Sequence, residues 1–336
     1  MINIDESERL AERNINEGDI SAAIKLLYEM IVQCAKEKKF LKAEQLRERM
    51  LEVDPMALDE IIRSAEIIEA EKSQALDPIH IEIWSRLYNT LSAEEKNALY
   101  FSLKDAAYGI NKPVFSQGDL NSNLYFLNQG QLKVIYRNQG GELLLKTIGP
   151  GQPAGQDHFF SYTVCTTTLI TLTNVNLKYL EKTALIKLKE EFPNLEQKLK
   201  DYCLSFPNVA ELLKRKKMDR RSLKRMKISG IWLINLLNKS GEPIGNPFKG
   251  EITDISIGGL SFEIRITKEE TARLLLGRKI NIKHNFSKSA SKIEIDQNGT
   301  IVGIYPYPFE DYSIHVKFDK MLNKSVIDII RHYSMI

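Results

Sequence analysis

The sequence predicts a multidomain α+β protein, with a helical N-terminal third followed by two β-rich parts. Three observations support this prediction. Residues 6–110 carry apolar side chains at helical spacing, and residues 113–180 alternate apolar and polar side chains between glycine-containing turns. Residues 228–318 return to strand patterning after a strongly basic segment. A chain of 336 residues is long enough for two or three domains.

The spacing of apolar residues over 18–55 predicts a pair of helices that ends at Asp54-Pro55. The two apolar faces consist of Ala22, Ala23, Leu26, Leu27, Met30, Ile31 and Cys34, followed by Phe40, Ala43, Leu46, Met50 and Leu51. The pair resembles one tetratricopeptide-type repeat, and a free-standing solenoid needs about three such repeats. We therefore expect a helical cap that docks or dimerises, with a peptide-binding groove as the alternative.

Two more helical segments are expected, over residues 56–73 and 77–108. Each has apolar residues at helical spacing. The second contains Ser92 and Glu95, which have the spacing of a capping box and indicate a helix start inside the segment.

A small β-roll or barrel is expected over residues 113–180. Its clearest strands are Leu124–Leu127, Leu132–Tyr136 and Leu143–Leu145. The intervening turns contain glycine, at Gly130, at Gly140-Gly141 and at Gly149-Pro150-Gly151. A helix over residues 182–202, interrupted at Pro193, closes this part.

A second barrel is expected in the C-terminal third. Its predicted strands cover residues 228–237, 248–255, 260–266, 279–284, 292–295, 299–305 and 312–318. A short helix over residues 267–276 interrupts these strands, and a helix over residues 324–333 ends the chain.

The net charge of +3 is unevenly distributed along the chain. Residues 1–100 carry 13 basic and 21 acidic side chains, whereas residues 213–336 carry 23 basic and 13 acidic ones. Nine of these basic residues lie within residues 214–227. This asymmetry predicts an anionic partner for the C-terminal third.

The composition argues against several classes of protein. The three cysteines, Cys34, Cys165 and Cys203, match no zinc or disulfide spacing, and the five histidines are scattered. The sequence has no apolar run of about 20 residues and no secretory signal pattern, so we expect a cytoplasmic protein without a membrane span. It also has no nucleophile–base arrangement, metal cluster or P-loop motif, so we expect neither an enzyme nor a bound cofactor.

The middle part resembles the cyclic-nucleotide-binding domain of bacterial catabolite activators and kinase regulatory subunits. The similarity lies in residues 113–119, in Leu124–Leu127 with Gly130, and in residues 148–151. The resemblance implies a Glu for the ribose hydroxyl and an Arg for the phosphate, but Gln156 and Cys165 stand at those positions. We therefore expect a degenerate nucleotide pocket in a spacer or dimerisation module, with a different ligand as the alternative.

The C-terminal third resembles the PilZ domain. The similarity lies in the R-x-x-x-R spacing of Arg221 and Arg225 and in the D-x-S-x-x-G sequence from Asp254 to Gly259. The resemblance implies that cyclic di-GMP is the ligand. Its phosphates and guanine would contact the arginines, and a guanine edge would contact Asp254, Ser256 and Gly259. The adjacent Arg220 is expected to assist, and Gly258-Gly259 to permit a positive φ near the ligand.

The predicted domains are a helical cap over residues 1–78, the degenerate nucleotide-binding-like domain over 79–205, a basic linker over 206–227 and the PilZ barrel over 228–336. We expect a bacterial cyclic di-GMP receptor that changes its domain arrangement and signals to a protein effector, with a homodimer left open. The alternatives are a dual sensor whose middle domain binds a cyclic mononucleotide, and a nucleic-acid-binding regulator. The barrel strands lack the aromatic residues of a base-stacking platform, which argues against nucleic acid.

Overall fold

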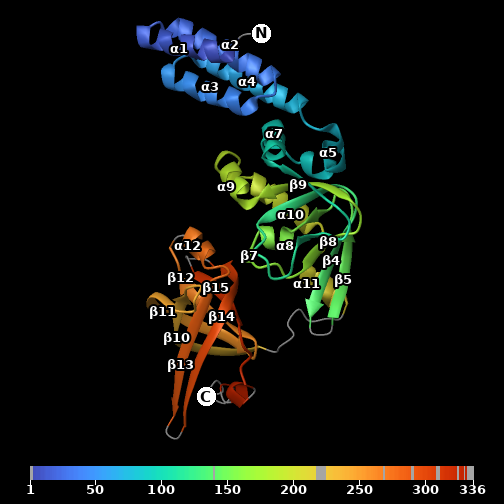
Figure 1. Ribbon diagram of the computed structural model, residues 1–336, viewed down its shortest axis with the longest axis vertical. Coiled ribbons are helices and arrows are strands. Elements are labelled where there is room, and N and C mark those ends of the chain that lie inside the picture. The colour runs from blue at the N-terminus through green and yellow to red at the C-terminus, as the bar shows by residue number, and fades with distance from the viewer. Residues whose placement is uncertain are drawn as a thin grey trace. The chain divides into compact units, whose positions relative to one another are not determined.

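The computed structural model describes residues 3–138, 141–216, 225–267, 269–288, 291–307, 311–323, 325–328 and 330. The chain forms two compact units (Figure 1). The first is helical and combines Met1–Lys104 with Thr183–Tyr202. The second combines Asp105–Lys182 with Cys203–Ile336 and contains both β-rich parts.

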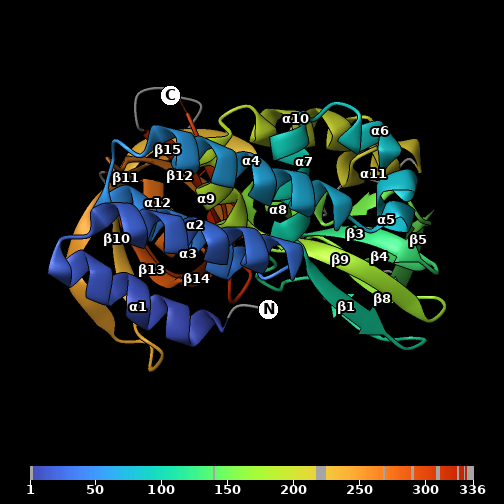
Figure 2. The same cartoon turned by 90° about the horizontal axis from the view of Figure 1, so that it is seen from above.

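The helical unit is built around α2, which contacts α1, α3 and α4 (Figure 2). Its helices are α1 Ile4–Glu17, α2 Ile20–Lys36, α3 Phe40–Val53, α4 Leu58–Gln74, α5 Pro78–Ile83, α6 Ser85–Tyr88, α7 Ala93–Ser102, α9 Lys182–Glu191 and α10 Leu195–Leu204. The predicted capping box is present at the start of α7. The side chain of Ser92 accepts a hydrogen bond from the Glu95 backbone, and the Glu95 carboxylate accepts one from the Ser92 backbone.

The predicted apolar faces form the core of α1–α4. Leu27, Met30 and Met50 are buried there, as are most of the other predicted positions. Leu51 differs, because 47% of the residue is exposed. It lies next to Met50 on α3, and neighbouring residues on a helix point about 100° apart, so only one of the two faces α2.

The first β-rich part is a roll of two four-stranded sheets. The first has the strand order β1-β9-β3-β6 and the second β2-β8-β4-β5. The strands are β1 Lys104–Tyr108, β2 Pro113–Phe115, β3 Asn123–Gln129, β4 Leu132–Asn138, β5 Gly141–Ile148, β6 Pro153–Ala154, β7 Tyr162–Thr163, β8 Thr168–Thr171 and β9 Val175–Glu181, with helix α8 Gln156–Phe159 between β6 and β7.

Two segments of this part differ from the sequence expectations. Residues 104–108 were expected to be helical but form β1, which pairs with β9 and is held there by an ion pair of 2.7 Å between Lys178 Nζ and Asp105. Within the expected basic linker, Val209–Arg215 forms helix α11. Val209, Leu212 and Leu213 on this helix belong to the core of the roll.

The second β-rich part is a closed antiparallel barrel of six strands. The strand order is β13-β10-β11-β12-β15-β14, and pairing of β13 with β14 closes the sheet. The strands are β10 Met226–Leu237, β11 Pro243–Ser256, β12 Gly259–Arg265, β13 Lys279–Lys288, β14 Ser291–Pro306 and β15 Asp311–Phe318, with helix α12 Glu269–Leu274 after β12. In the second unit, β7 also pairs with β14, at Thr163–Gly303 and Tyr162–Ile304.

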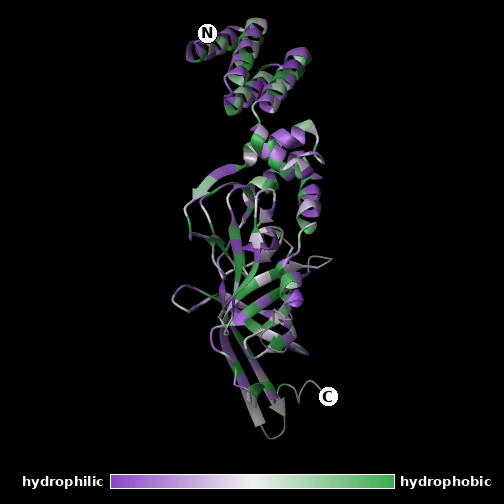
Figure 3. Cartoon of the chain, turned by 90° about the vertical axis from the view of Figure 1, so that its right-hand side faces the viewer, coloured by the Kyte–Doolittle hydropathy of each residue, from purple (hydrophilic) through white to green (hydrophobic). Residues whose placement is uncertain are grey.

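Alternating side chains fill the barrel. Hydrophobic and hydrophilic stretches alternate along the strands in Figure 3, as the period of two requires. Trp232, Ile234, Phe262 and Ile314 are among the core residues, each at most 1% exposed. Ile327 and Ile330 belong to the same core, so the described part of the expected C-terminal helix packs on the barrel.

One strand of the barrel is longer than expected. Residues 292–295 and 299–305 were predicted as separate strands but belong to the single strand β14, which pairs with β13 over its first ten residues. The turn-forming residues between them are bonded across the sheet instead. The Asn281 amide donates to Asp296 at 2.6 Å and to Asn298 at 2.8 Å.

Truncation of the barrel core is expected to destabilise the barrel strongly. In a Trp84→Phe background, Trp232 is the remaining tryptophan and reports unfolding of the barrel. Phe262→Ala removes a fully buried ring and should lower the free energy of unfolding by about 3–5 kcal/mol in a urea titration. The control Ile231→Ala, at a residue that is 64% exposed, should change it by less than about 0.5 kcal/mol. Equal effects of the two variants would contradict the assigned faces.

Candidate functional site

A β-bulge in β11 creates the candidate site on the barrel. Ile252 pairs with Phe262 but Asp254 pairs with Ser261, so Thr253 is the extra residue. Since residues two apart on a strand face the same side, Asp254 would otherwise share the buried face of Ile252. The bulge turns the Asp254 carboxylate to the outer wall of the barrel, where 26% of the side chain is exposed.

The Arg225 guanidinium lies against this carboxylate. Its NH1 group donates to Asp254 Oδ1 at 2.9 Å and to Ser261 Oγ at 2.8 Å, while the Ser261 hydroxyl donates to the same Oδ1 at 2.9 Å. NH1 also lies 3.5 Å from His315 Nδ1. The Arg225 side chain is 22% exposed, so both charges are largely removed from water and depend on each other.

The turn that joins β11 to β12 is stabilised by a hydrogen bond from a buried serine. Ser256 is 5% exposed, and its hydroxyl donates to the Gly259 carbonyl at 3.1 Å. Neither Gly258 nor Gly259 adopts a positive φ, contrary to the sequence expectation. Gly259 is required for a different reason, because a Cβ there would lie 2.1 Å from the Val316 carbonyl oxygen.

The predicted binding residues thus divide into three groups. Arg225 and Asp254 are brought together on the outer wall, whereas Ser256 and Gly259 shape the adjacent turn. Arg220 and Arg221 lie outside the described residues. The sequence analysis did not identify Ser261 or His315. Only the strand register could have indicated these two residues, because Asp254 pairs with Ser261 and Ser261 pairs with His315.

The predicted nucleotide pocket of the roll is built around α8. Gly155 precedes this helix with φ of 84°, and a Cβ there would lie 2.6 Å from the Asn123 carbonyl oxygen. Gln156 is the first residue of α8. Its Nε2 is buried and has no hydrogen-bond partner among the described residues. The amide therefore supplies a donor where the resemblance implies an acidic acceptor.

Cys165 occupies the predicted arginine position and is 1% exposed. Its backbone is tied to the turn before β3, with its N–H donating to the Asp119 carbonyl at 2.8 Å and its carbonyl accepting from Gly118 at 2.8 Å. Burial raises the pKa of the Cys165 thiol to about 12, so the side chain is uncharged at neutral pH. It supplies no positive charge for a phosphate.

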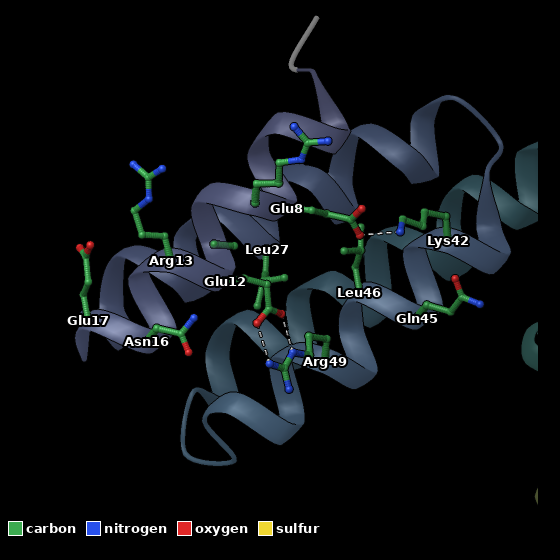
Figure 4. Close-up of a pocket in the computed structure, with 12 residues that line it drawn as sticks. Glu8, Glu12, Arg13, Asn16, Glu17, Leu27, Lys42, Gln45, Leu46 and Arg49 are labelled. Carbon is green, nitrogen blue, oxygen red and sulfur yellow. Dashed lines mark hydrogen bonds and ion pairs between the residues drawn. The ribbon is translucent and has the colours of Figure 1, made fainter.

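The helical unit contains a groove of about 800 Å³ between α1 and α3 (Figure 4). Its lining is charged, and two ion pairs cross the groove. Arg49 binds both oxygens of the Glu12 carboxylate at 2.9 and 3.0 Å, and Lys42 pairs with Glu8. These ion pairs join α1 to α3 across the groove, where a bound peptide would have to compete with them.

The described residues show neither a metal-binding cluster nor a helix that could span a membrane. They contain no group of three or more histidine, cysteine, aspartate or glutamate side chains arranged to hold a metal ion. None of the described helices is long and apolar enough to cross a bilayer.

Comparison with known families identifies the middle part. Residues 107–192 match the family model of the cyclic nucleotide-binding domain. The match covers the roll and α9 and does not extend to the barrel. The chain therefore contains a cyclic-nucleotide-binding-type domain, as the sequence predicted. The comparison with curated proteins finds no match.

Solved structures of low overall similarity include proteins of this family. A cyclic nucleotide-binding domain from Methylobacillus flagellatus is 19% identical, with a TM-score of 0.35, over 41% of this chain and 78% of that one. The catabolite activator protein of Thermus thermophilus is 24% identical, with a TM-score of 0.32, over 39% and 57%. A Trypanosoma cruzi protein kinase A regulatory subunit bound to guanosine is 14% identical, with a TM-score of 0.36, over 44% and 50%. These values are too low to transfer a ligand to this chain.

The three thiols are expected to be unreactive in the folded protein. Burial raises the pKa of Cys34, and raises that of Cys165 and of Cys203 to about 12. Since the thiolate is the reactive form, Ellman's reagent at pH 8 should modify less than about one thiol in ten over an hour. The same assay in denaturant should titrate all three cysteines. Rapid modification of Cys165 in the native protein would show that the roll pocket is open.

Proposed function

We propose that this chain is a bacterial cyclic di-GMP receptor that binds the messenger on the outer wall of its C-terminal barrel. The observation that carries the proposal is the meeting of two sequence motifs. Arg225 ends the R-x-x-x-R motif and Asp254 begins the D-x-S-x-x-G motif, 29 residues later, and their side chains lie 2.9 Å apart. The PilZ resemblance implies these two residues as ligand contacts, and their proximity supports that assignment.

The chemistry of the pair suits a nucleotide with two phosphates. The contacts of Arg225 with the described part of the barrel all use NH1, so its Nε and NH2 donors are available there to a phosphate. Asp254 uses Oδ1 for Arg225 and Ser261, so Oδ2 is available to the N1–H and N2–H edge of guanine. The Arg225–Asp254 pair therefore offers donors to a phosphate and an acceptor to a guanine base of the same ligand.

The position of the motif in the chain suggests how binding is transmitted. The R-x-x-x-R segment connects α11, which packs in the core of the roll, to β10, the first strand of the barrel. A dianionic ligand held by Arg221, Arg225 and Asp254 would fix this connection. The proposed output is a changed arrangement of the cap, the roll and the barrel, which a protein effector recognises.

In this proposal the cyclic-nucleotide-binding-type domain is a spacer or dimerisation module and not a second sensor. Cys165 is neutral and buried at the position where the family resemblance implies the phosphate-binding arginine. A phosphate there would lose water without gaining a positively charged partner, which is unfavourable. We retain the predicted domain boundaries and the protein effector as parts of this proposal.

Removal of Arg225 is expected to weaken messenger binding strongly. In isothermal titration at 25 °C, Arg225→Ala should weaken cyclic di-GMP binding by about 30-fold or more, since loss of one partner from a desolvated charged contact costs at least about 2 kcal/mol. Asp254→Ala should have an effect of similar size. The matched control is Arg278→Ala, at an exposed arginine just before β13 whose side chain donates to the nearby Leu274 carbonyl. Unchanged affinity in both site variants would overturn the proposal.

The dual-sensor alternative gives a distinct thermal-shift result. Cyclic AMP at 1 mM is expected to leave the melting temperature unchanged, because the roll lacks a cation at Cys165. Cyclic di-GMP, added to the same sample, should raise it. A rise with cyclic AMP alone would favour the dual sensor. Strongly salt-dependent binding to DNA or RNA without ligand would favour the nucleic-acid-binding regulator.

A further inference from the structure

A transverse row of residues crosses the outer wall of the barrel. In the strand register Asp254 of β11 pairs with Ser261 of β12, Ser261 with His315 of β15, and His315 with Gly303 of β14. The neighbours of His315 on β15, Ile314 and Val316, lie in the core, so the imidazole faces outward with Ser261 and Asp254. The Arg225 guanidinium lies over the first three residues of this row.

The His315 ring is held on two further sides. Its Nε2 lies 3.3 Å from the Ser313 hydroxyl, and the ring packs edge-on against Tyr305 with centroids 4.7 Å apart. Gly303 lies beside both residues on β14. A Cβ at Gly303 would lie 3.2 Å from Cε2 of Tyr305, so the tyrosine ring would have to shift slightly, whereas its distance of 3.7 Å from Cβ of His315 is an ordinary contact. The imidazole orientation is therefore fixed by the barrel and not by Arg225.

The contact chemistry fits a neutral imidazole that accepts from the guanidinium. Arg225 NH1 carries two hydrogens, which point to Asp254 and Ser261, with His315 Nδ1 as a third acceptor at 3.5 Å. With the proton on Nε2, His315 donates to Ser313 and presents the lone pair of Nδ1 to NH1. At 3.5 Å this contact is weaker than the other two, so its effect is on orientation.

We propose that His315 is a positioning residue for Arg225. Asp254 and Ser261 bind NH1 from one side of the row, and His315 limits the swing of the guanidinium on the other. The Nε and NH2 donors then keep a fixed direction before the phosphate arrives, which reduces the entropy lost on binding. This role rests on the proposed function, because the benefit is measured as affinity for cyclic di-GMP.

Two substitutions at the same position separate orientation from packing. His315→Phe keeps a ring against Tyr305 and removes the acceptor, whereas His315→Asn keeps an acceptor near the Nδ1 position. His315→Phe should weaken cyclic di-GMP binding about 3- to 10-fold in isothermal titration, the effect expected for one hydrogen bond. His315→Asn should stay within about twofold of the wild type. The control His284→Phe makes the same exchange on β13, where His284 stacks on Trp232, and should leave the affinity unchanged.

A second measurement tests the role without ligand. The NMR signal of the Arg225 Nε–H group, assigned by its loss in Arg225→Lys, should shift or broaden in His315→Phe and stay in place in His315→Asn. If His315→Phe binds with wild-type affinity and leaves this signal unmoved, the positioning role is wrong and the receptor proposal stands. If the signal moves but the wild type does not bind cyclic di-GMP, the receptor proposal fails and the positioning of Arg225 by His315 stands.

Discussion

Closure of the six-stranded barrel fixes the strand register on which the candidate site depends. A slip of one residue in any strand would move every side chain of that strand to the opposite face. Closure through β13 and β14 leaves little freedom for such a slip, and two of the local irregularities in the barrel adjust the register at the site. The extra residues Thr253 in β11 and Val302 in β14 turn Asp254 and Gly303 to the outer wall without displacing the isoleucines of the core.

The two β-rich parts differ in whether their candidate ligand positions carry charged side chains. On the barrel, Arg225 and Asp254 are half-buried charges that compensate each other, and among the described residues each keeps further donor or acceptor atoms for a ligand. In the roll, the corresponding ligand positions hold an amide and a thiol, Gln156 and Cys165, and the thiol is packed among apolar residues. Burial without a charge stabilises a fold, whereas burial of a charge requires a partner. This contrast is the reason that the proposed function places the anionic ligand on the barrel.

The sequence was sufficient to predict most of the fold but only part of the site. Apolar periodicity located the helical hairpin and most strands, and the motif spacing located Arg225 and Asp254. Local patterns failed where pairing partners decide the structure, as at Lys104–Tyr108, which form a strand because β9 lies alongside. Ser261 and His315 were missed for the same reason, since each is an ordinary strand residue until register places it beside Arg225. Residues 217–224, with Arg220 and Arg221, lie outside the described structure.

The glycine that ends the D-x-S-x-x-G motif has a consequence for how relatives of this chain are recognised. Even one methyl group on Gly259 would collide with the backbone of β15, whether or not a ligand is bound. Ser256 likewise closes the turn by bonding to Gly259. Both motif positions are therefore required by the barrel itself, and we expect them to persist in a barrel that has lost its ligand. Arg225 and Asp254 compensate each other's charge and do not shape that turn, so under the proposed function their joint retention or loss would distinguish a receptor from an inert copy of the same barrel.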